Sequence, residues 1–282
     1  MPRYFIELSY KGTAYSGFQI QKNSVTIQSE LEKALEIFFK EPFVLTGASR
    51  TDSGVHALQN FFHFDTDQLL GISMLGEQSK ITSPEFLIEK LEDLPFGQEE
   101  MNLKKYIYNI NAILPQDIAV KRIFRVDDHA HCRFDAISRE YKYFIYRDKN
   151  PFLQHTAYYY PYQLSLIKLN EAASLLLGKK DFTSFSKRNT QVKNFICGVQ
   201  LSEWIVEESK LIYHVKANRF LRGMVKAMVG TMLRVGTGKI TLNEFNQIIE
   251  KRDCSESDFS VPSHGLFLIA VKYKQDLIHP YK

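Results

Sequence analysis

The chain has 282 residues, of which 44% are hydrophobic and 24% are charged, and this composition is typical of a folded globular protein rather than a disordered one. Its 36 basic and 32 acidic side chains leave a net charge of +4, which allows a polyanionic partner without requiring one. No run of about 18 apolar residues and no apolar N-terminal leader is present, so neither membrane insertion nor secretion is expected.

The first half of the chain predicts strands around one amphipathic helix. Residues 3–10 alternate between apolar and polar side chains, as a half-buried strand does. One face of a following helix would carry Ile27, Leu31, Leu35 and Phe38. Residues 43–49 and 57–65 are strand-like on either side of a turn. Residues 66–100 are weakly patterned, apart from a short helix opened by Ser83 and Pro84, and we interpret them as an elaborated connection.

The second half repeats these ingredients without repeating the sequence. Strands are expected at 118–126, 136–147, 195–206, 210–217 and 266–273. Helices are expected at 166–177, ending before Gly178, at 220–235, and after a capping box formed by Thr241 and Glu244. The pattern predicts an α+β protein with two halves, 1–115 and 116–282, each a mostly antiparallel sheet with a helix on one face. The last strand would pack back near the gap between the halves.

Residues 47–57 read GASRTDSGVHA, with Arg50 and Asp52 on a turn between two apolar segments. An Asp-Ser-Gly tripeptide is an ordinary turn sequence, because the Asp side chain caps the turn and glycine accepts a positive φ. Local chemistry alone therefore favours a purely structural role for Asp52.

The predicted helix at 220–235 has two distinct faces. Leu221, Val225, Met228, Met232 and Val235 cluster on one side, while Arg219, Arg222 and Lys226 cluster on the other. Such a basic face is most often only solvated. This one contains no balancing acid, so an external anion or a carboxylate from elsewhere in the fold is its natural partner.

Residues 139–152 interleave aromatic and basic side chains. In a strand Tyr141 and Tyr143 share one face and Tyr146 lies on the other. Most such tyrosines are packing residues, but one beside a basic groove can stack on an unpaired nucleobase.

Several ordered blocks resemble one family, the TruA-type tRNA pseudouridine synthases. GASRTDSGVHA is similar to the family's catalytic signature, whose usual form is close to GRTDAGVHA. YFIELSYKGTAYSGFQIQ, NAILPQDIAV, HCRFDAISREYKYFIY, DFTSF, ANRFLRGMVKAMVGTMLRVG and HGLFLIAVKY match other family segments in the same order. Ordered blocks are far more specific than one motif, so the resemblance outweighs the purely structural interpretation of Asp52.

The resemblance implies conversion of uridine to pseudouridine at positions 38 to 40 of the tRNA anticodon arm, with Asp52 as nucleophile. Lys226 would be its cationic partner, opposing the loss of hydration that disfavours a buried carboxylate. Tyr141 would stack on the uracil, and Arg50 would displace the target nucleotide from its stack. Arg133, Arg219 and Arg222 would contact phosphates.

Some positions depart from the family pattern. Lysine at 226 replaces the usual arginine, which keeps the charge but loses the bidentate geometry. Ser49 and Ser53 replace the usual glycine and alanine. His56 and His131 lie near the motifs, and we interpret both as structural histidines rather than general bases.

The resemblance also implies the pseudouridine synthase fold: two α+β halves whose mostly antiparallel sheets join into one extended sheet around a basic central cleft. It implies a homodimer in which one tRNA contacts both subunits. Isomerisation needs no redox cofactor and no nucleotide energy. Cys132, Cys197 and Cys254 lie far apart without metal-ligand spacing, so a reducing cytoplasm, no structural zinc and no disulfides are expected.

Two rival functions remain open from the residues alone. A non-catalytic RNA-binding module would need a cleft and stacking aromatics but not Asp52, although a ribonucleoprotein-type strand motif is absent. A glycosidase-like hydrolase would need a second carboxylate beside Asp52. No acid in the matched motifs pairs with Asp52 by position, although Asp135 and Asp181 are available away from it.

Overall fold

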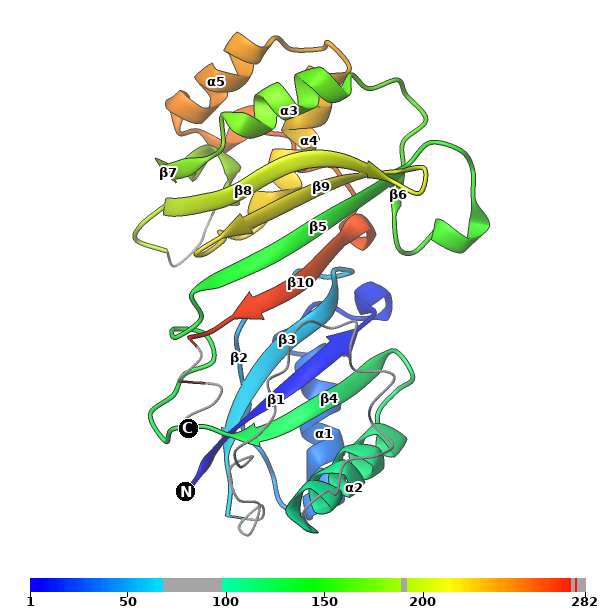
Figure 1. The fold of residues 1–282 in the computed structure, drawn as a ribbon, viewed down its shortest axis with the longest axis vertical. Coiled ribbons are helices and arrows are strands. Elements are labelled where there is room, and N and C mark those ends of the chain that lie inside the picture. Colours follow the sequence, from blue (N-terminus) through cyan, green and yellow to red (C-terminus); the bar gives the residue numbers. More distant parts are fainter. Residues whose placement is uncertain (68–97, 189–191, 275–276, 278–282) are drawn as a thin grey trace.

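The strands of the computed structural model belong to one sheet (Figure 1). The structure describes residues 1–67, 98–188, 192–274 and 277. The strands are β1 (Arg3–Tyr10), β2 (Thr46–Gly47), β3 (His56–Asp65), β4 (Ile118–Arg125), β5 (Ser138–Tyr146), β6 (Tyr158–Tyr159), β7 (Gly178–Asp181), β8 (Ile196–Glu207), β9 (Lys210–Ala217) and β10 (Leu266–Lys272). The helices are α1 (Ile27–Phe39), α2 (Gln98–Ile113), α3 (Leu166–Ser174), α4 (Met224–Gly236) and α5 (Leu242–Lys251).

The sheet has 10 strands and the order β4-β1-β3-β10-β5-β9-β8-β7, with β2 paired to β3 and β6 paired to β5. All its pairings are antiparallel except those of β10 with β3 and of β5 with β6. The fold is therefore the α+β class with one extended, mostly antiparallel sheet, as expected from the sequence. Within the described part of the chain, no helix is long and apolar enough to cross a membrane.

Strands β4, β1 and β3 form the lower part of the sheet in Figure 1, where α1 and α2 pack. The alternation in β1 predicted a half-buried strand, but residues 4–8 are all buried. Burial extends to Glu7, whose carboxylate accepts a hydrogen bond from Arg122 Nε at 2.6 Å. A paired charge can be buried because its partner replaces the lost hydration.

Strands β5, β9, β8 and β7 form the upper part, with α3, α4 and α5 (Figure 1). In α4, 11 of the 13 residues are buried. Its methionines contact the sheet: Trp204 Nε1 lies 3.4 Å from Met232 Sδ, and the Tyr213 hydroxyl lies 3.9 Å from Met228 Sδ. The predicted capping box of α5 is present, with Thr241 and Glu244 each accepting from the other's backbone N–H.

Strand β10 joins the two parts (Figure 1). It pairs in parallel with the start of β3, with Phe267 opposite His56, and antiparallel with β5, with Leu268 opposite Tyr141. Strand β10 thus lies between the segment that follows the Arg-Thr-Asp turn and the strand that carries Tyr141. Strand β4, which follows the proposed boundary at 115, pairs with β1. The division at 115 itself stays a prediction.

Two expected elements are shorter than predicted. The 43–49 strand is limited to Thr46–Gly47, because Leu45 N–H donates to Glu32 of α1 at 3.0 Å instead of to a strand. The helix expected at 166–177 ends at Ser174, since the N–H groups of Leu176 and Leu177 turn back to carbonyls three residues earlier.

The sequence did not predict α2, which is hydrogen-bonded to the strand that follows it, β4. Asn111 Nδ2 donates to Val120 O at 2.9 Å, and Val120 N–H donates to Asn111 Oδ1 at 2.7 Å. The short helix expected at Ser83 and Pro84 lies outside the described residues.

Candidate active site

The loop between β2 and β3 carries Asp52, whose side chain is half-buried. The loop closes as the predicted turn: Val55 N–H donates to Asp52 O at 3.2 Å, and Gly54 has a φ of +77°. Ser49, where the family usually has glycine, does not have a positive φ, so this backbone does not require a glycine.

Buried polar groups beneath the loop fix its backbone. Asn60 is fully buried, and its Nδ2 donates to Ser49 O at 2.9 Å and to the Tyr10 hydroxyl at 3.2 Å. That hydroxyl lies 2.8 Å from Thr51 Oγ1. The residues on both sides of Arg50 are thus tied to β1 and β3, which limits how far Asp52 can move.

The segment after β1 covers the loop from the other side. Phe18 N–H donates to Thr51 O at 3.1 Å, and Ser53 Oγ donates to Tyr15 O at 3.0 Å. Gly17 has a φ of +98°, and a Cβ added there would lie 3.1 Å from Thr51 O. A side chain at Gly17 would therefore be strained and would press on the Asp52 loop.

Tyr141 approaches the same site from β5. Its side chain is buried, and its ring makes an edge contact with Phe220 at a centroid distance of 5.0 Å. Burial raises the pKa of Tyr141 to about 12, and the negative charge of Asp52 acts in the same direction. The phenol therefore stays protonated near neutral pH, close enough to feel the Asp52 carboxylate.

The Ser49 hydroxyl lies beside this phenol. It is buried and has no partner of ordinary hydrogen-bond geometry among the described residues. Its proximity nonetheless lowers the pKa of Tyr141, partly offsetting the effect of burial. Hydrogen bonds in unliganded active sites are often long or misaligned and tighten when substrate binds.

Lys226 lies in the first turn of α4 and is half-buried. Its Nζ donates to Ser263 Oγ at 3.3 Å. Burial lowers the pKa of Lys226, the positive charge of Lys187 lowers it further, and the Asp52 carboxylate raises it. Lys226 and Asp52 thus attract each other, although within the described ranges the two do not form an ion pair of 4 Å or less.

The predicted helical stripe of Arg219, Arg222 and Lys226 is wrong. Helix α4 begins at Met224, after Gly223 in the left-handed region with a φ of +74°. Helical spacing cannot be extrapolated back across a residue of that conformation, so Arg219 and Arg222 belong to the preceding loop. Lys187 N–H donates to Arg222 O at 3.0 Å and holds that loop.

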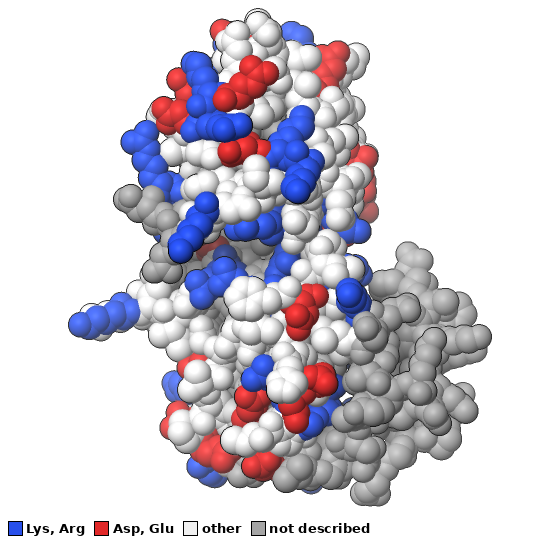
Figure 2. All heavy atoms as spheres, turned by 90° about the vertical axis from the view of Figure 1, so that its left-hand side faces the viewer, with Lys and Arg blue, Asp and Glu red and all other residues white. Residues whose placement is uncertain are grey.

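Four arginines gather near the loop instead. Burial lowers the pKa of Arg133, and the charges of Arg50, Arg139 and Arg219 lower it further, so the four guanidinium groups repel one another. Figure 2 shows basic side chains around the hollowed middle of the molecule, with acidic ones mainly above and below. Concentrated positive charge of this kind attracts a polyanion.

Arg139 differs from the other three in using its guanidinium for the fold. Its Nη1 donates to Ala136 O at 3.0 Å and to Asn218 O at 3.1 Å. It therefore ties the segments that carry Arg133 and Arg219 together. The side chains of Arg50, Arg133 and Arg219 make no ion pair with any other described residue.

The histidines near the motifs have structural partners. His56 Nδ1 accepts from Gly12 N–H at 3.1 Å, which leaves Nε2 to donate to His264 O at 3.1 Å. Burial lowers the pKa of His56, so the neutral form persists. His131 Nδ1 accepts from Arg133 N–H at 3.1 Å. These contacts support the structural interpretation of both rings.

His63, His131 and Cys132 offer ligand atoms within 4.8 Å of one another. Two of these potential ligand atoms already make hydrogen bonds within the protein. Cys132 Sγ donates to Thr46 O at 3.0 Å, and His63 Nδ1 accepts from Cys132 N–H at 3.2 Å. Burial raises the pKa of Cys132 to about 12, whereas a metal needs the thiolate. This arrangement fits a packed structural cluster better than a metal site.

The two spare carboxylates of the hydrolase hypothesis are engaged locally. Asp135 accepts from His131 N–H at 2.6 Å. Asp181 accepts from Thr183 N–H at 2.9 Å and pairs with Arg252 at 3.4 Å. Neither interacts with Asp52.

Sequence reasoning missed three contributors to the site. Tyr10 holds the loop through Thr51, Arg139 ties the arginine segments together, and Lys187 adds a second cation near Lys226. Lys187 lies two residues after the DFTSF block, and its position beside this family segment could have identified it as a site residue. Nothing in local pattern marks Tyr10, since it is one alternating position of a strand.

The α+β fold, with a loop carboxylate near a buried phenol and several cations, fits a class of protein that acts on a polyanion. Residues 172–274 match a family model described as tRNA pseudouridine synthase. The chain is 40% identical to tRNA pseudouridine synthase A of Parabacteroides distasonis and to that of Bacteroides fragilis, in each case over 98% of both chains. It is 35% identical to the Bacillus subtilis enzyme over 94% of this chain and 97% of that one.

This protein therefore belongs to the tRNA pseudouridine synthase family. Its members are isomerases that act on uridine in tRNA. Membership of this enzyme family argues against the rival hypothesis of a non-catalytic RNA-binding module.

Proposed function

We propose that this protein converts uridine to pseudouridine at one or more of positions 38, 39 and 40 of the tRNA anticodon arm, with Asp52 as the nucleophile. One observation carries the proposal: the half-buried Asp52 interacts electrostatically with both Tyr141 and Lys226, which come from β5 and α4 of the other half. A carboxylate, a buried phenol and a cation thus come within electrostatic range of one another.

The reaction exchanges one bond to the sugar for another. The bond from uracil N1 to C1′ breaks, the base turns, and a bond from C5 to C1′ forms. The C5 proton is lost and N1 gains a proton, so the product is an isomer and no electrons are gained or lost. A covalent bond to Asp52 would divide this cleavage into easier steps. Attack at sugar C1′ and attack at uracil C6 both fit this outline.

Lys226 would keep Asp52 anionic while a nucleotide covers it. A carboxylate that loses its hydration favours the neutral form, and a nearby cation opposes this change. The Ser263 hydroxyl accepts from Lys226 Nζ and aims the ammonium group. Lysine has the positive charge but lacks the planar guanidinium group of the arginine usual in the family. We therefore assign Lys226 electrostatic stabilisation rather than bidentate binding.

Tyr141 would support the uracil ring and take part in moving the C5 proton. Phe220 holds the phenol edge-on, which leaves little freedom for its ring. A phenol with a pKa of about 12 stays protonated until a stronger base approaches, so it can stack on the base without carrying charge.

The arginines would bind the RNA backbone and help to displace the target nucleotide from the stacked bases. Arg50 is exposed two residues before Asp52, where it can hold a phosphate of the displaced nucleotide. Arg133, Arg219 and Arg222 would contact neighbouring phosphates. The resemblance further suggests a homodimer in the cytoplasm that binds the anticodon stem-loop with residues of both subunits.

The test is to incubate unmodified tRNA with the purified protein and to map pseudouridine. Asp52→Asn is expected to lower product formation by about a thousandfold or more, because the other catalytic groups cannot replace a missing nucleophile. Its tRNA affinity should stay within about tenfold of wild type, since phosphate contacts supply most of the affinity. Asp148→Asn, at an exposed position after β5, is the matched control and should behave as wild type.

The outcomes separate the rival functions. Pseudouridine in the product supports the proposal, abasic sites would support a hydrolase, and unchanged RNA would support a binding protein. Normal turnover by Asp52→Asn would remove Asp52 from the mechanism, and product at other tRNA positions would overturn the assignment to 38, 39 and 40.

A further inference from the structure

A hollow of about 240 Å³ lies beside Arg50 and is separate from the reacting groups. Asp52, Tyr141 and Lys226 do not line it. The lining side chains that matter here are Phe18, Gln19, Arg50, His131, Arg133 and Phe134. The hollow is thus continuous with the Asp52 loop through one residue, Arg50.

The charges that line the hollow favour the binding of an anion. Arg50 and Arg133 both line it, none of its lining residues is acidic, and neither arginine pairs with a described carboxylate. Two guanidinium groups that repel each other gain most from a ligand that places a phosphate between them.

The hollow also offers an aromatic face. The Phe134 side chain is 73% exposed, which is unusual for a large apolar ring in a polar surrounding. The Arg133 guanidinium lies 5.8 Å from its centroid, and the His131 ring lies 4.2 Å away. An exposed ring flanked by a guanidinium group and an imidazole ring is a platform on which a nucleobase can stack.

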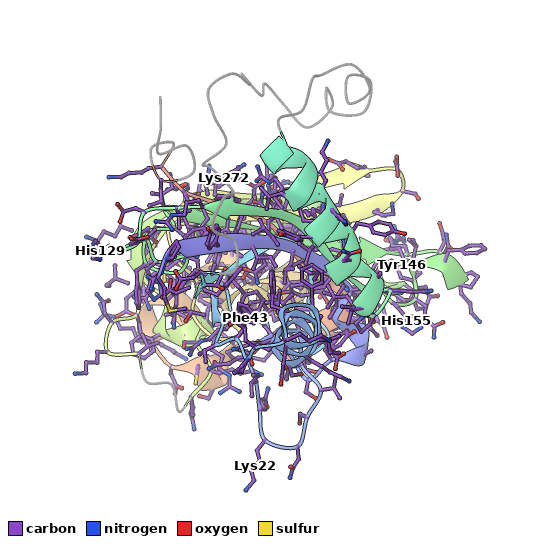
Figure 3. The ribbon with its side chains drawn as sticks, turned by 90° about the horizontal axis from the view of Figure 1, so that it is seen from below. Lys22, Phe43, His129, Tyr146, His155 and Lys272 are labelled. Atoms are coloured by element: carbon purple, nitrogen blue, oxygen red, sulfur yellow. The ribbon has the colours of Figure 1, made fainter. Side chains whose placement is uncertain are left out.

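Two amides at the hollow differ in their availability. Gln28 is committed, because its Nε2 donates to Glu32 and to Leu45 O, each at 2.9 Å. Gln19 is exposed and has no hydrogen-bond partner within the part of the chain described, so its amide is free to bond to the edge of a base. The segment that follows it projects from the body, with Lys22 at its tip (Figure 3).

We propose that this hollow binds a second nucleobase of the RNA, one that is unstacked next to the target uridine. Phe134 would stack on the base, Gln19 would bond to its edge, and Arg50 and Arg133 would hold the phosphate between the two nucleotides. Capture of the neighbouring base would offset part of the free-energy cost of removing the target nucleotide from its stack. This inference rests on the proposed function, because it places the second base relative to the target.

The test uses an anticodon stem-loop with 2-aminopurine at a nucleotide flanking the target, because this base fluoresces more when unstacked. Wild-type protein should raise the fluorescence on binding. Phe134→Ala should abolish most of this rise and weaken binding about tenfold, as expected for one lost stacking contact. Gln19→Ala should weaken binding about threefold. Phe152→Ala removes another exposed ring, outside the hollow, and is the matched control.

The measurements are fluorescence titration, single-turnover pseudouridine formation and the unfolding midpoint of each variant. Equal fluorescence and affinity for Phe134→Ala, Gln19→Ala and wild type would overturn the inference, even if wild type forms pseudouridine normally. Equal losses in Phe152→Ala would also overturn it, since the effect would then belong to any exposed ring. Absence of pseudouridine with wild type would instead overturn the proposed function. Unchanged midpoints would exclude misfolding as the cause of a loss.

Discussion

The two sides of the candidate site are held in place by different forces. On one side, the Asp52 loop is an irregular segment fixed by buried hydrogen bonds from Asn60, Tyr10 and Thr51. On the other side, Tyr141 and Lys226 project from a strand and a helix that are fixed by apolar packing, with 11 of 13 residues of α4 buried. A loop has no regular set of hydrogen bonds between its own backbone N–H and C=O groups, so these groups need other polar partners. Helices and strands already pair their backbone groups and need only a packed core.

The difference has a consequence for mutations. Changes on the packed side should alter the chemistry with little effect on the loop, because the apolar packing of α4 keeps the helix in place when the half-buried Lys226 is replaced. Changes beneath the loop should alter stability and chemistry together, because the same hydrogen bonds serve both.

Apart from replacement of Asp52 itself, the largest effect is expected on the packed side, for Lys226→Met. Removing a cation that faces a reacting carboxylate should lower the single-turnover rate about a hundredfold. Arg222→Met removes an equal charge from an exposed position in the preceding loop and should stay within about threefold of wild type. Equal losses in the two variants would show that both residues only bind phosphates.

A smaller effect is expected beneath the loop, for Tyr10→Phe. The variant leaves Thr51 Oγ1 and one Asn60 N–H without their partner, which should lower the free energy of unfolding by about 1–2 kcal/mol. It should also lower the single-turnover rate.

Tyr213→Phe is the matched control, since this buried hydroxyl lies 2.8 Å from Ser202 Oγ and belongs to the packed side. Denaturant unfolding should give similar destabilisation in both variants. A loss of rate in Tyr213→Phe as large as in Tyr10→Phe would contradict the distinction between the two sides.

The third prediction concerns Ser49, whose buried hydroxyl lacks a well-formed partner among the described residues. Ser49→Ala should raise the free energy of unfolding by about 1 kcal/mol, because an unsatisfied buried hydroxyl is costly. Denaturant titration measures this change. A loss of stability instead would mean that the hydroxyl already bonds in the free protein.

The smallest change at neutral pH is expected for Lys226→Arg, the residue usual in the family. Burial lowers the pKa of Lys226 below its ordinary value of 10.5, so the lysine loses its charge, and the enzyme its rate, at a lower pH than an ordinary lysine would. Arginine stays charged, so the alkaline fall in single-turnover rate should move to higher pH. An unchanged pH profile would show that Lys226 does not cause that fall.

Sequence pattern predicted most elements of the fold because each depends on neighbours in the chain. The alternation at 210–217 gave β9 at the bounds observed, and the Thr241 and Glu244 capping box marked the start of α5. Sequence pattern gave wrong predictions where a side-chain hydrogen bond or a left-handed glycine interrupted the expected element. Glu32 took the Leu45 donor from the expected strand, and Gly223 ended the helical phase that had placed Arg219 beside Lys226.

For this protein, the sequence by itself determined the family, the α+β class and the residues that carry charge, because those depend on residue identity and short-range periodicity. Only the tertiary structure decided which of them meet. Strand β10 pairs with both β3 and β5 and so brings the Asp52 loop toward Tyr141, and the chain folds Arg50, Arg133, Arg139 and Arg219 into one cluster. Apart from Arg133 and Arg139, the residues that these contacts join lie 80 or more positions apart, and the reason the contacts form is the burial of a shared core, which no local pattern encodes.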